Sequence, residues 1–400
     1  MTIVEINSVE YGSTGKICIQ IAKKANENKM SVFVCTSGAR KLADNTSHNR
    51  ILIGNKLSEK LHLLLDRISG FNGCFSFFAT LKFIRKIKKL NPDIIHLHNL
   101  HNCYINLPLL FKYIKKNNIK VVWTLHDCWA FTGKCPHFVF ANCDKWKTSC
   151  YNCPQVKSYP KSYTDRTKTM YRLKKKWFTK VKDLTIVTPS EWLAGLVKQS
   201  FLKDYPVKVI NNGIDLDVFT SAESDFREKY NLHNKKIVLG VASPWSNKKG
   251  LDVFIELSRL LDENYQIVLV GTDESADKQL PKNIISIHRT HNQTELAKIY
   301  TTADVFVNPT KEDTFPTVNI EALACGTPVL TFDTGGSPEI IDKTCGSVVD
   351  YNDVNALKKE IIRICSVKPY SKENCLKRAK HFNQSDKFEE YICIYERIAK

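Results

Sequence analysis

The sequence contains no apolar run close to the roughly 18 to 20 residues that a membrane-spanning helix needs. Its start, Met1–Val9, also lacks the basic stretch with which a secretory signal begins, and it includes Glu5 instead. We therefore expect a cytoplasmic protein. At 400 residues the chain is too long for one core of ordinary size, so two domains are expected.

Acidic residues are scarce in the first half of the chain. Residues 1–200 hold 33 Lys and Arg against 12 Asp and Glu, whereas residues 201–400 hold 26 against 29. In segments 82–89, 112–120 and 172–178 the basic residues alternate with aliphatic or aromatic ones. This pattern suits an anionic membrane surface, at about 1 kcal/mol per basic residue near it. Solvated helix faces and a nucleic-acid-binding surface are the alternatives.

Most of the 14 cysteines are scattered and are expected to be reduced core residues. Four of them, however, lie within 19 residues and include one Cys-x2-Cys pair: Cys135, Cys143, Cys150 and Cys153. Such a group could enclose a tetrahedral zinc ion, although the gap between the first two thiols is wider than in common zinc sites. Free thiols and disulfides are the other interpretations.

Apolar runs alternate with longer amphipathic segments in both halves, which predicts parallel sheets covered by helices on both faces. Two doubly wound α/β domains result, with a junction near residues 207–215, where a strand ends in turn residues. The final helix, over 385–399, carries apolar residues at helical spacing. The expected strands are 2–6, 31–35, 94–98, 121–125 and 184–188 in one sheet, and 236–242, 266–270, 284–288, 304–308 and 329–332 in the other.

The segment from Lys311 to Pro328 predicts an anion-binding loop and helix. A buried strand ends at Asn308, acidic residues follow in the loop, and a helix is expected over 316–325. The free N–H groups of the helix start and the helix dipole favour a phosphate. Glu321 lies about one turn deeper, where hydroxyl groups of a ribose suit it better than a phosphate. The alternative is that Asp313 caps the helix and Glu321 is solvated.

Asp313 and Glu321 are eight positions apart and are followed by Ala-Leu-Ala-Cys-Gly-Thr-Pro-Val. This segment resembles the Glu-x7-Glu motif of retaining group 1 (family four) glycosyltransferases of the GT-B architecture. The resemblance implies that the first acid contacts the donor sugar or phosphate and that Glu321 binds the ribose. This chain has Asp313 at the first position, with Glu312 before it, so either acid could face the sugar.

Two other loops match the family's donor-binding loops. Gly12 and Gly15 follow the first strand, where glycines allow the backbone to approach an anion, although the spacing is not that of a Walker A loop. Lys248 and Lys249 lie after the first strand of the second domain, and in the family basic residues there neutralise the leaving diphosphate. Pro244 occupies the usual arginine position. The resemblance implies donor contacts from the start of the helix as well, at Phe315, Thr317, Val318 and Asn319.

His126 ends a buried strand in a phrase that resembles a subset of the family active on bacterial surface polysaccharides, including enzymes of the colanic-acid and O-antigen type. In that subset the matching histidine contacts the donor sugar. Without the resemblance, a structural role would be the simpler interpretation. His96, His98 and His101 lie nearby in sequence, and either a metal site or packing beside the cleft would explain them.

The resemblance covers the whole chain and implies two Rossmann-like domains facing across a cleft. Residues 1–205, joined by a returning helix over 382–400, would form the acceptor side, and residues 206–381 would bind the nucleotide sugar. The expected reaction moves a sugar from a UDP-, GDP- or dTDP-sugar to a glycan or lipid-linked acceptor, with retention and without a metal or cofactor. His126, Asp313 or Glu312, and Lys249 would be catalytic.

The expected place of action is the inner face of the cell membrane, in lipopolysaccharide or other surface polysaccharide synthesis, and no nucleic acid is expected as a partner. One rival function is a GT-B-fold epimerase or hydrolase, which would use the same nucleotide cleft without an acceptor. The other is a basic nucleic-acid-binding protein with a cysteine zinc site, which would leave the two acids and their helix unexplained.

Overall fold

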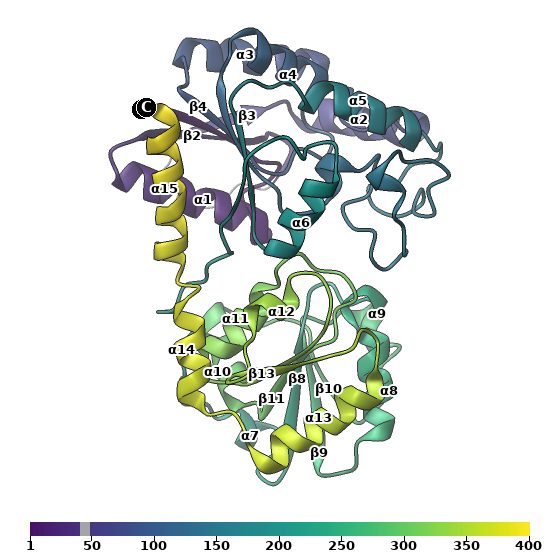
Figure 1. The fold of residues 1–400 in the computed structure, drawn as a ribbon. Coiled ribbons are helices and arrows are strands. Elements are labelled where there is room, and N and C mark those ends of the chain that lie inside the picture. The colour runs from purple at the N-terminus through teal and green to yellow at the C-terminus, as the bar shows by residue number, and fades with distance from the viewer. Residues whose placement is uncertain (41–48) are drawn as a thin grey trace. The chain divides into compact units, whose positions relative to one another are not determined.

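The computed structural model describes residues 1–40 and 49–400. The chain divides into two compact units, of which the first comprises Met1–Ile210 with Phe388–Lys400 and the second Asn211–Lys387 (Figure 1). Each unit is built on one parallel sheet with helices on both faces, so the predicted α/β fold with two Rossmann-like domains is confirmed.

The first unit contains a seven-stranded parallel sheet in the order β3-β2-β1-β4-β5-β6-β7. Its strands are β1 (Thr2–Ile6), β2 (Ser31–Ser37), β3 (Asn49–Ile53), β4 (Ile94–Leu97), β5 (Lys120–Thr124), β6 (Leu184–Thr188) and β7 (Val207–Val209). Its helices are α1 (Gly12–Glu27), α2 (Lys56–Ser69), α3 (Phe77–Leu90), α4 (Leu107–Lys116), α5 (Thr167–Phe178), α6 (Glu191–Gln199) and most of α15 (Gln384–Ala399). Short 3-10 turns lie at Trp129–Phe131 and Lys145–Lys147.

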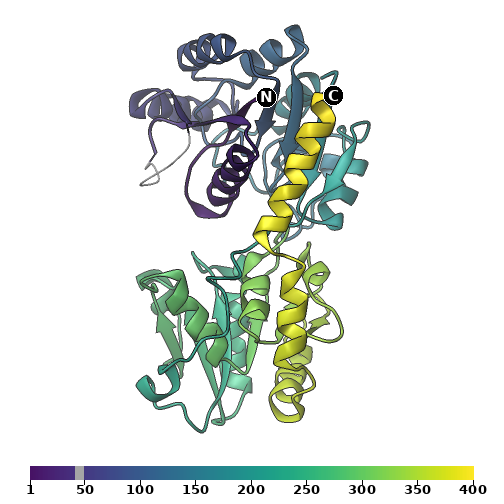
Figure 2. The same ribbon diagram turned by 90° about the vertical axis from the view of Figure 1, so that its left-hand side faces the viewer.

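Alternate residues of these strands enter two separate cores, as the period of a strand requires. On one face of β1, Ile3 packs with residues of α1 and α15. On the other face, Val4 packs with aromatic residues of α3, α4 and α5. Helix α15 runs along the first unit in Figure 2, and its buried residues are Phe388, Tyr391, Ile392, Ile394 and Tyr395.

The second unit contains a six-stranded parallel sheet in the order β10-β9-β8-β11-β12-β13. Its strands are β8 (Lys236–Val241), β9 (Tyr265–Val270), β10 (Ile284–Ile287), β11 (Val305–Asn308), β12 (Val329–Phe332) and β13 (Gly346–Val349). Its helices are α7 (Phe226–Lys229), α8 (Leu251–Leu260), α9 (Glu274–Asp277), α10 (Gln293–Thr302), α11 (Thr317–Ala324), α12 (Ser337–Ile340), α13 (Val354–Val367) and α14 (Lys372–Lys380), with a 3-10 turn at Asn247–Lys249.

Each sheet begins with a central strand and has one position where the strand order reverses. In the first unit that position lies between β1 and β4, and in the second between β8 and β11. Open parallel sheets bind ligands beyond the carboxyl ends of their strands at such a position. One candidate site is therefore expected beyond β1 and β4 in the first unit, and another beyond β8 and β11 in the second. Among the described residues, none of the helices is long and apolar enough to cross a membrane.

Candidate active site

Three loops meet beyond the carboxyl ends of β8, β11 and β12 in the second unit. The Lys311 N–H donates to the Lys248 carbonyl at 2.8 Å, which joins the first two loops. The Gly336 N–H donates to the Asp313 carbonyl at 3.3 Å, which joins the third. Gly335 has φ +58°, and a Cβ atom there would lie 1.7 Å from the Asp313 carbonyl oxygen. The close approach of the third loop to the acidic loop therefore requires glycine.

The two predicted acids are each paired with one of the two predicted lysines. Lys249 Nζ lies 2.6 Å from Asp313 Oδ2, and Lys248 forms an ion pair with Glu312. Both lysine side chains are 39% exposed, whereas the Asp313 side chain is 20% exposed and that of Glu312 only 3%. Asp313 is therefore the more accessible acid. An ammonium group has three donors, so each lysine can hold its carboxylate and still bind an anion.

Helix α11 begins at Thr317, with Pro316 before it, close to the predicted start. Thr317 and Val318 are partly exposed at its first turn. Asn319 is buried, and its Oδ1 accepts a hydrogen bond from Asn308 Nδ2 at 2.7 Å. Phe315 is also buried and packs edge-on against Phe382. The backbone of this turn, rather than the side chains of Asn319 and Phe315, is thus what the helix start presents to a ligand.

Glu321 is held by a residue that the sequence did not identify. Its Oε2 accepts a hydrogen bond from the Tyr300 hydroxyl at 3.1 Å. Tyr300 is fully buried in α10, and burial together with the nearby Glu321 raises its pKa well above the usual value. The phenol therefore remains a donor to the carboxylate. In the sequence Tyr300 is simply one of the apolar positions of an amphipathic helix, and no local signal links it to Glu321.

His126 lies just beyond β5, beside the switch point of the first unit. Its Nε2 is 3.1 Å from His98 Nδ1, and the two rings are stacked with centroids 5.4 Å apart. Desolvation, with a smaller effect of His98, lowers the pKa of His126 to about 3, and desolvation also lowers that of His98 to about 3. Both imidazoles are neutral at physiological pH. They line a small pocket together with His101 and Asp127.

Asp127 keeps the neighbouring part of this pocket negatively charged. Burial by itself would raise its pKa, but His101 and the Trp129 N–H hold the pKa at about 2. The His101 Nε2 lies 3.0 Å from Asp127 Oδ2. The pocket thus combines the Asp127 carboxylate with the neutral imidazoles of His98 and His126, a set suited to hydrogen bonding with sugar hydroxyls.

A deeper polar group lies under His126. Glu5, His96 and His98 have ligand atoms that all lie within 4.8 Å of one another. In the described ranges 1–40 and 49–400, this is the only group of three or more histidine, cysteine or acidic residues that lies so close together. Both nitrogens of His96 are already bonded, to the Tyr395 hydroxyl at 2.6 Å and to Thr124 Oγ1 at 2.8 Å. These bonds favour the packing interpretation of the histidines over a metal site.

The glycines after β1 have different local roles. Helix α1 begins at Gly12, which has φ +69° and nothing within 4 Å of an added Cβ atom. Gly15 is instead required by close packing, because a Cβ there would lie 2.5 Å from the carbonyl carbon of Glu10. Of these two glycines, only Gly12 leaves open space beside the backbone.

Cys135, Cys143, Cys150 and Cys153 line one cavity in the long connection over residues 125–166, between β5 and α5. All four are free thiols, so these cysteines form no disulfide bond in the structure. The Gly133 N–H donates to Cys150 Sγ at 3.1 Å, and the Gln155 N–H bonds to Cys153. Within the described part of the chain, no three of the sulfur atoms lie within 4.8 Å of one another. Zinc binding would have to draw the four thiols together.

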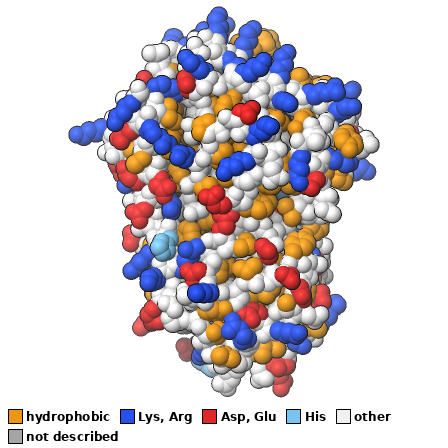
Figure 3. All heavy atoms as spheres, in the orientation of Figure 1, with side chains coloured by type: hydrophobic (Ala, Val, Ile, Leu, Met, Phe, Trp, Pro, Cys, Tyr) orange, Lys and Arg blue, Asp and Glu red, His pale blue; other side chains and the backbone are white. Residues whose placement is uncertain are grey.

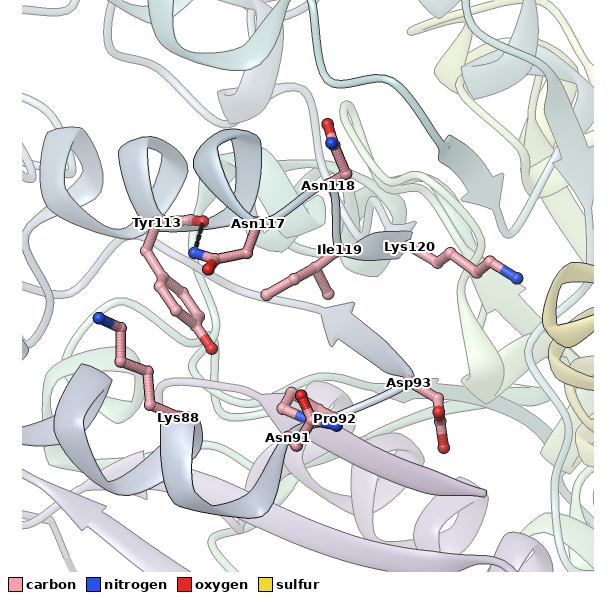
Figure 4. A pocket seen from close by; sticks show the side chains of 9 residues that line it. All are labelled: Lys88, Asn91, Pro92, Asp93, Tyr113, Asn117, Asn118, Ile119 and Lys120. Atoms are coloured by element: carbon pink, nitrogen blue, oxygen red, sulfur yellow. Dashed lines mark hydrogen bonds between the residues drawn. The ribbon is translucent and has the colours of Figure 1, made fainter.

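A larger surface pocket, of about 340 Å³, lies in the first unit at the end of the sheet opposite to His126. Figure 4 shows Lys88 and Lys120 on its two sides, and the Asn117 amide donating to the Tyr113 carbonyl at 2.7 Å. The lining residues lie at the ends of α3 and α4 and at the starts of β4 and β5, so the pocket lies at the amino ends of the strands. It is therefore not at the edge where an open parallel sheet binds its ligand.

Two family profiles match the chain. The profile described as Glycosyltransferase Family 4 matches residues 15–218, and that described as Glycosyl transferases group 1 matches residues 222–382. Among curated proteins, the chain is 25% identical over 321 residues to WcaC of Escherichia coli K12, named as a colanic acid biosynthesis glycosyl transferase, with 77% of each chain covered. It is also 25% identical to a 41.2 kDa protein of the cps region of Klebsiella pneumoniae, with 79% of this chain and 82% of the other covered.

Solved structures share the fold over nearly the whole chain. Sucrose-phosphate synthase from Thermosynechococcus elongatus aligns with a TM-score of 0.73 and 18% identity, covering 99% of this chain and 98% of that one. Anabaena HepE in complex with UDP-glucose aligns with a TM-score of 0.68 and 15% identity, covering 99% of each chain. The chain therefore belongs to the group 1 glycosyltransferases of the GT-B architecture and is a glycosyltransferase.

Proposed function

We propose that the protein transfers a sugar from a nucleotide donor to a glycan or lipid-linked oligosaccharide in bacterial surface polysaccharide synthesis. The observation that carries this proposal is the meeting of two acids, two lysines and a helix start at the switch point of the second sheet. The relationship to WcaC supports the polysaccharide product, and the complexes of HepE with UDP and UDP-glucose support a UDP-sugar as donor. GDP- and dTDP-sugars are the other donors to be tested.

The donor is held by groups of the second unit in this proposal. The first-turn N–H groups of α11, near Thr317 and Val318, bind the diphosphate together with Lys248 and Lys249. Glu321 accepts hydrogen bonds from the ribose hydroxyls, and the Tyr300 hydroxyl fixes its position. Of the two neighbouring acids, we assign Asp313 to the donor sugar because it is more exposed than Glu312.

The proposed transfer is retaining and needs no divalent metal. The bond between the anomeric carbon and the leaving phosphate breaks, and the acceptor oxygen bonds to the same face of the sugar. The acceptor proton passes to an oxygen of the leaving phosphate. Lys248, Lys249 and the α11 amides stabilise the charge that develops on the diphosphate. A neutral His126 binds the donor sugar through hydrogen bonds and supplies no proton near pH 7.

Each domain has one part of this task in the proposal. The domain of residues 1–205, with the helix over 382–400, receives the acceptor, and the domain of residues 206–381 binds the nucleotide sugar. The excess of basic residues in the first half favours action at the anionic inner face of the membrane. Figure 3 shows Lys and Arg side chains spread over the unit that carries α3, α4 and α5.

Incubating the purified protein with UDP-, GDP- and dTDP-sugars, with and without a lipid-linked acceptor, tests the function. We expect nucleotide release that depends on the acceptor and a product whose anomeric configuration matches that of the donor. A changed sugar nucleotide, or a free sugar formed equally well without acceptor, would indicate the rival epimerase or hydrolase. Salt-dependent RNA binding without donor turnover would indicate the nucleic-acid-binding alternative.

We also propose that the four thiols Cys135, Cys143, Cys150 and Cys153 hold a structural zinc ion. The connection over residues 125–166 is long and contains only two short 3-10 turns as regular structure. Backbone N–H groups already point at two of the sulfurs, as they do around bound metal thiolates. Closure of the group around zinc would cross-link residues 135–153 within this connection.

A further inference from the structure

Helix α2 has its polar and apolar faces reversed relative to an ordinary surface helix. The residues that it buries are Glu59, His62 and Asp66. The residues that it exposes include six large apolar side chains: Leu57 at 76%, Leu61 and Leu64 at 54%, Ile68 at 55%, Leu63 at 38% and Leu65 at 36%. A surface helix of a soluble protein normally turns its apolar stripe toward the core. The leucines of α2 therefore require a different partner.

The buried polar face fixes the helix in this orientation. The Glu59 carboxylate accepts a hydrogen bond from Ser37 Oγ at 2.5 Å and forms an ion pair with Arg40. His62 Nδ1 lies 2.7 Å from Ser76 Oγ. Rotating the helix to bury its leucines would break these bonds and would separate buried charges from their partners.

Asp66 anchors the second half of the helix in the same way. Its Oδ2 accepts hydrogen bonds from Asn72 Nδ2 at 2.7 Å and from Cys103 Sγ at 3.3 Å. A capping box of Asn55 and Ser58 closes the start of the helix, and Gly70 in the left-handed conformation ends it. The outward direction of the leucines is thus built into the fold of the first unit.

Further exposed aromatic residues adjoin this helix. The Tyr163 N–H donates to the Arg67 carbonyl at 2.7 Å, and the Tyr163 side chain is 67% exposed. Phe77 and Phe78, 49% and 83% exposed, begin α3 directly after Ser76, which contacts α2. We define the exposed apolar residues of α2 with Phe77, Phe78 and Tyr163 as the α2 face. Contiguous apolar surface of this kind marks an interaction site.

The exposed charged residues of α2 and α3 are all positive. The exposed charged residues of α2 are Lys56, Lys60 and Arg67, and its two acids are the buried Glu59 and Asp66. The next helix, α3, adds five more exposed cations and no acid: Lys82, Arg85, Lys86, Lys88 and Lys89. Leucines with interfacial aromatic residues and cations fit the boundary between acyl chains and anionic headgroups of a lipid bilayer.

We propose that the α2 face docks the protein on an anionic lipid bilayer, with the leucines of α2 inserted among the acyl chains. The proposal deepens the proposed function, since it specifies the surface by which the enzyme reaches a lipid-linked acceptor. The basic segments 112–120 and 172–178 then contribute long-range attraction, whereas α2 supplies the insertion.

The test is co-sedimentation of the full-length protein with vesicles of phosphatidylcholine, alone or mixed with phosphatidylglycerol. We expect binding to the mixed vesicles. Replacing Leu57, Leu61 and Leu64 by Ser should lower the partition coefficient by about a hundredfold, or about 2.7 kcal/mol. The matched control replaces two exposed apolar residues of α13, Ile362 and Val367, by Ser and should leave binding unchanged.

Two further readouts separate this proposal from its alternatives. UDP binding measured by titration calorimetry in the absence of vesicles should be equal in the wild type and the triple leucine variant, so vesicle binding is measured independently of the proposed reaction. Vesicle binding that is equal in the wild type and the triple variant would overturn the proposal. So would a wild-type dimer in solution that the triple variant abolishes while neither protein binds vesicles, because the α2 face would then be covered by a second copy.

Discussion

Replacing Gly335 by Ala should open the donor site of the second unit. The added Cβ atom would lie 1.7 Å from the Asp313 carbonyl oxygen, whereas real contacts of this kind exceed 3.0 Å, so the two loops must separate by more than an ångström. The left-handed conformation adds about 1 kcal/mol for Ala, and loss of the Gly336 hydrogen bond to Asp313 adds about 1 kcal/mol. With about 1 to 3 kcal/mol for the forced separation, we expect a destabilisation of about 3 to 5 kcal/mol.

Substitutions of two other glycines separate the cost of the left-handed backbone from the cost of the forced contact. Gly12 has φ +69° but open space around an added Cβ, so Gly12→Ala should cost about 1 kcal/mol. Gly195 in α6 has open space and no positive φ, so Gly195→Ala should be neutral or stabilising by up to about 1 kcal/mol. Calorimetric unfolding of the three variants, with UDP titrations, measures both effects. If Gly335→Ala unfolds like Gly12→Ala and binds UDP like the wild type, the described contact between the loops is wrong.

Three further predictions concern other parts of the molecule. Tyr300→Phe should weaken UDP binding about three- to tenfold in titration calorimetry, since it removes one hydrogen bond to a carboxylate, and the effect should vanish when Glu321 is already Ala. His98 and His126 are buried and have pKa values near 3 in the folded protein, so they stay neutral at pH 5. In the unfolded chain the same side chains bind protons below about pH 6.5, which favours the unfolded state. Urea unfolding at pH 5 should therefore show about 2 kcal/mol less stability per histidine than at pH 8, and an unchanged stability would contradict their burial. Metal analysis should find about one zinc per chain in the wild type and a loss of zinc in Cys153→Ser, and a metal-free wild type would refute the thiol site.

The sequence predicted the parts of the fold that have strong local patterns. The central strands and the helix over 317–324 follow from apolar runs and from Pro316 and Gly326, which act within a few residues. The edge strands β3 and β13 were missed because Asn49–Ile53 is largely accessible and Gly346–Val349 begins with Gly-Ser, so neither shows a buried apolar run.

Other features depend on partners distant in the sequence. The pairing of Lys249 with Asp313 joins residues 64 positions apart, and no local pattern specifies which lysine meets which acid. The same holds for Tyr300 and Glu321. On α2 the periodicity of the leucines alone would point them into the core, and the orientation is reversed only because Glu59 and Asp66 find partners on other elements.

The most direct test of the donor site compares two acids of the second unit. Glu321→Ala removes the carboxylate assigned to the ribose, and Glu339→Ala removes a partly buried acid of α12 with no assigned role. Nucleotide release is measured with the donor that the wild type accepts. We expect Glu321→Ala to lower kcat/KM by at least about tenfold, or about 1.4 kcal/mol, and Glu339→Ala to retain wild-type values. Equal turnover by the wild type and Glu321→Ala would contradict the assignment of this loop and helix as the donor site.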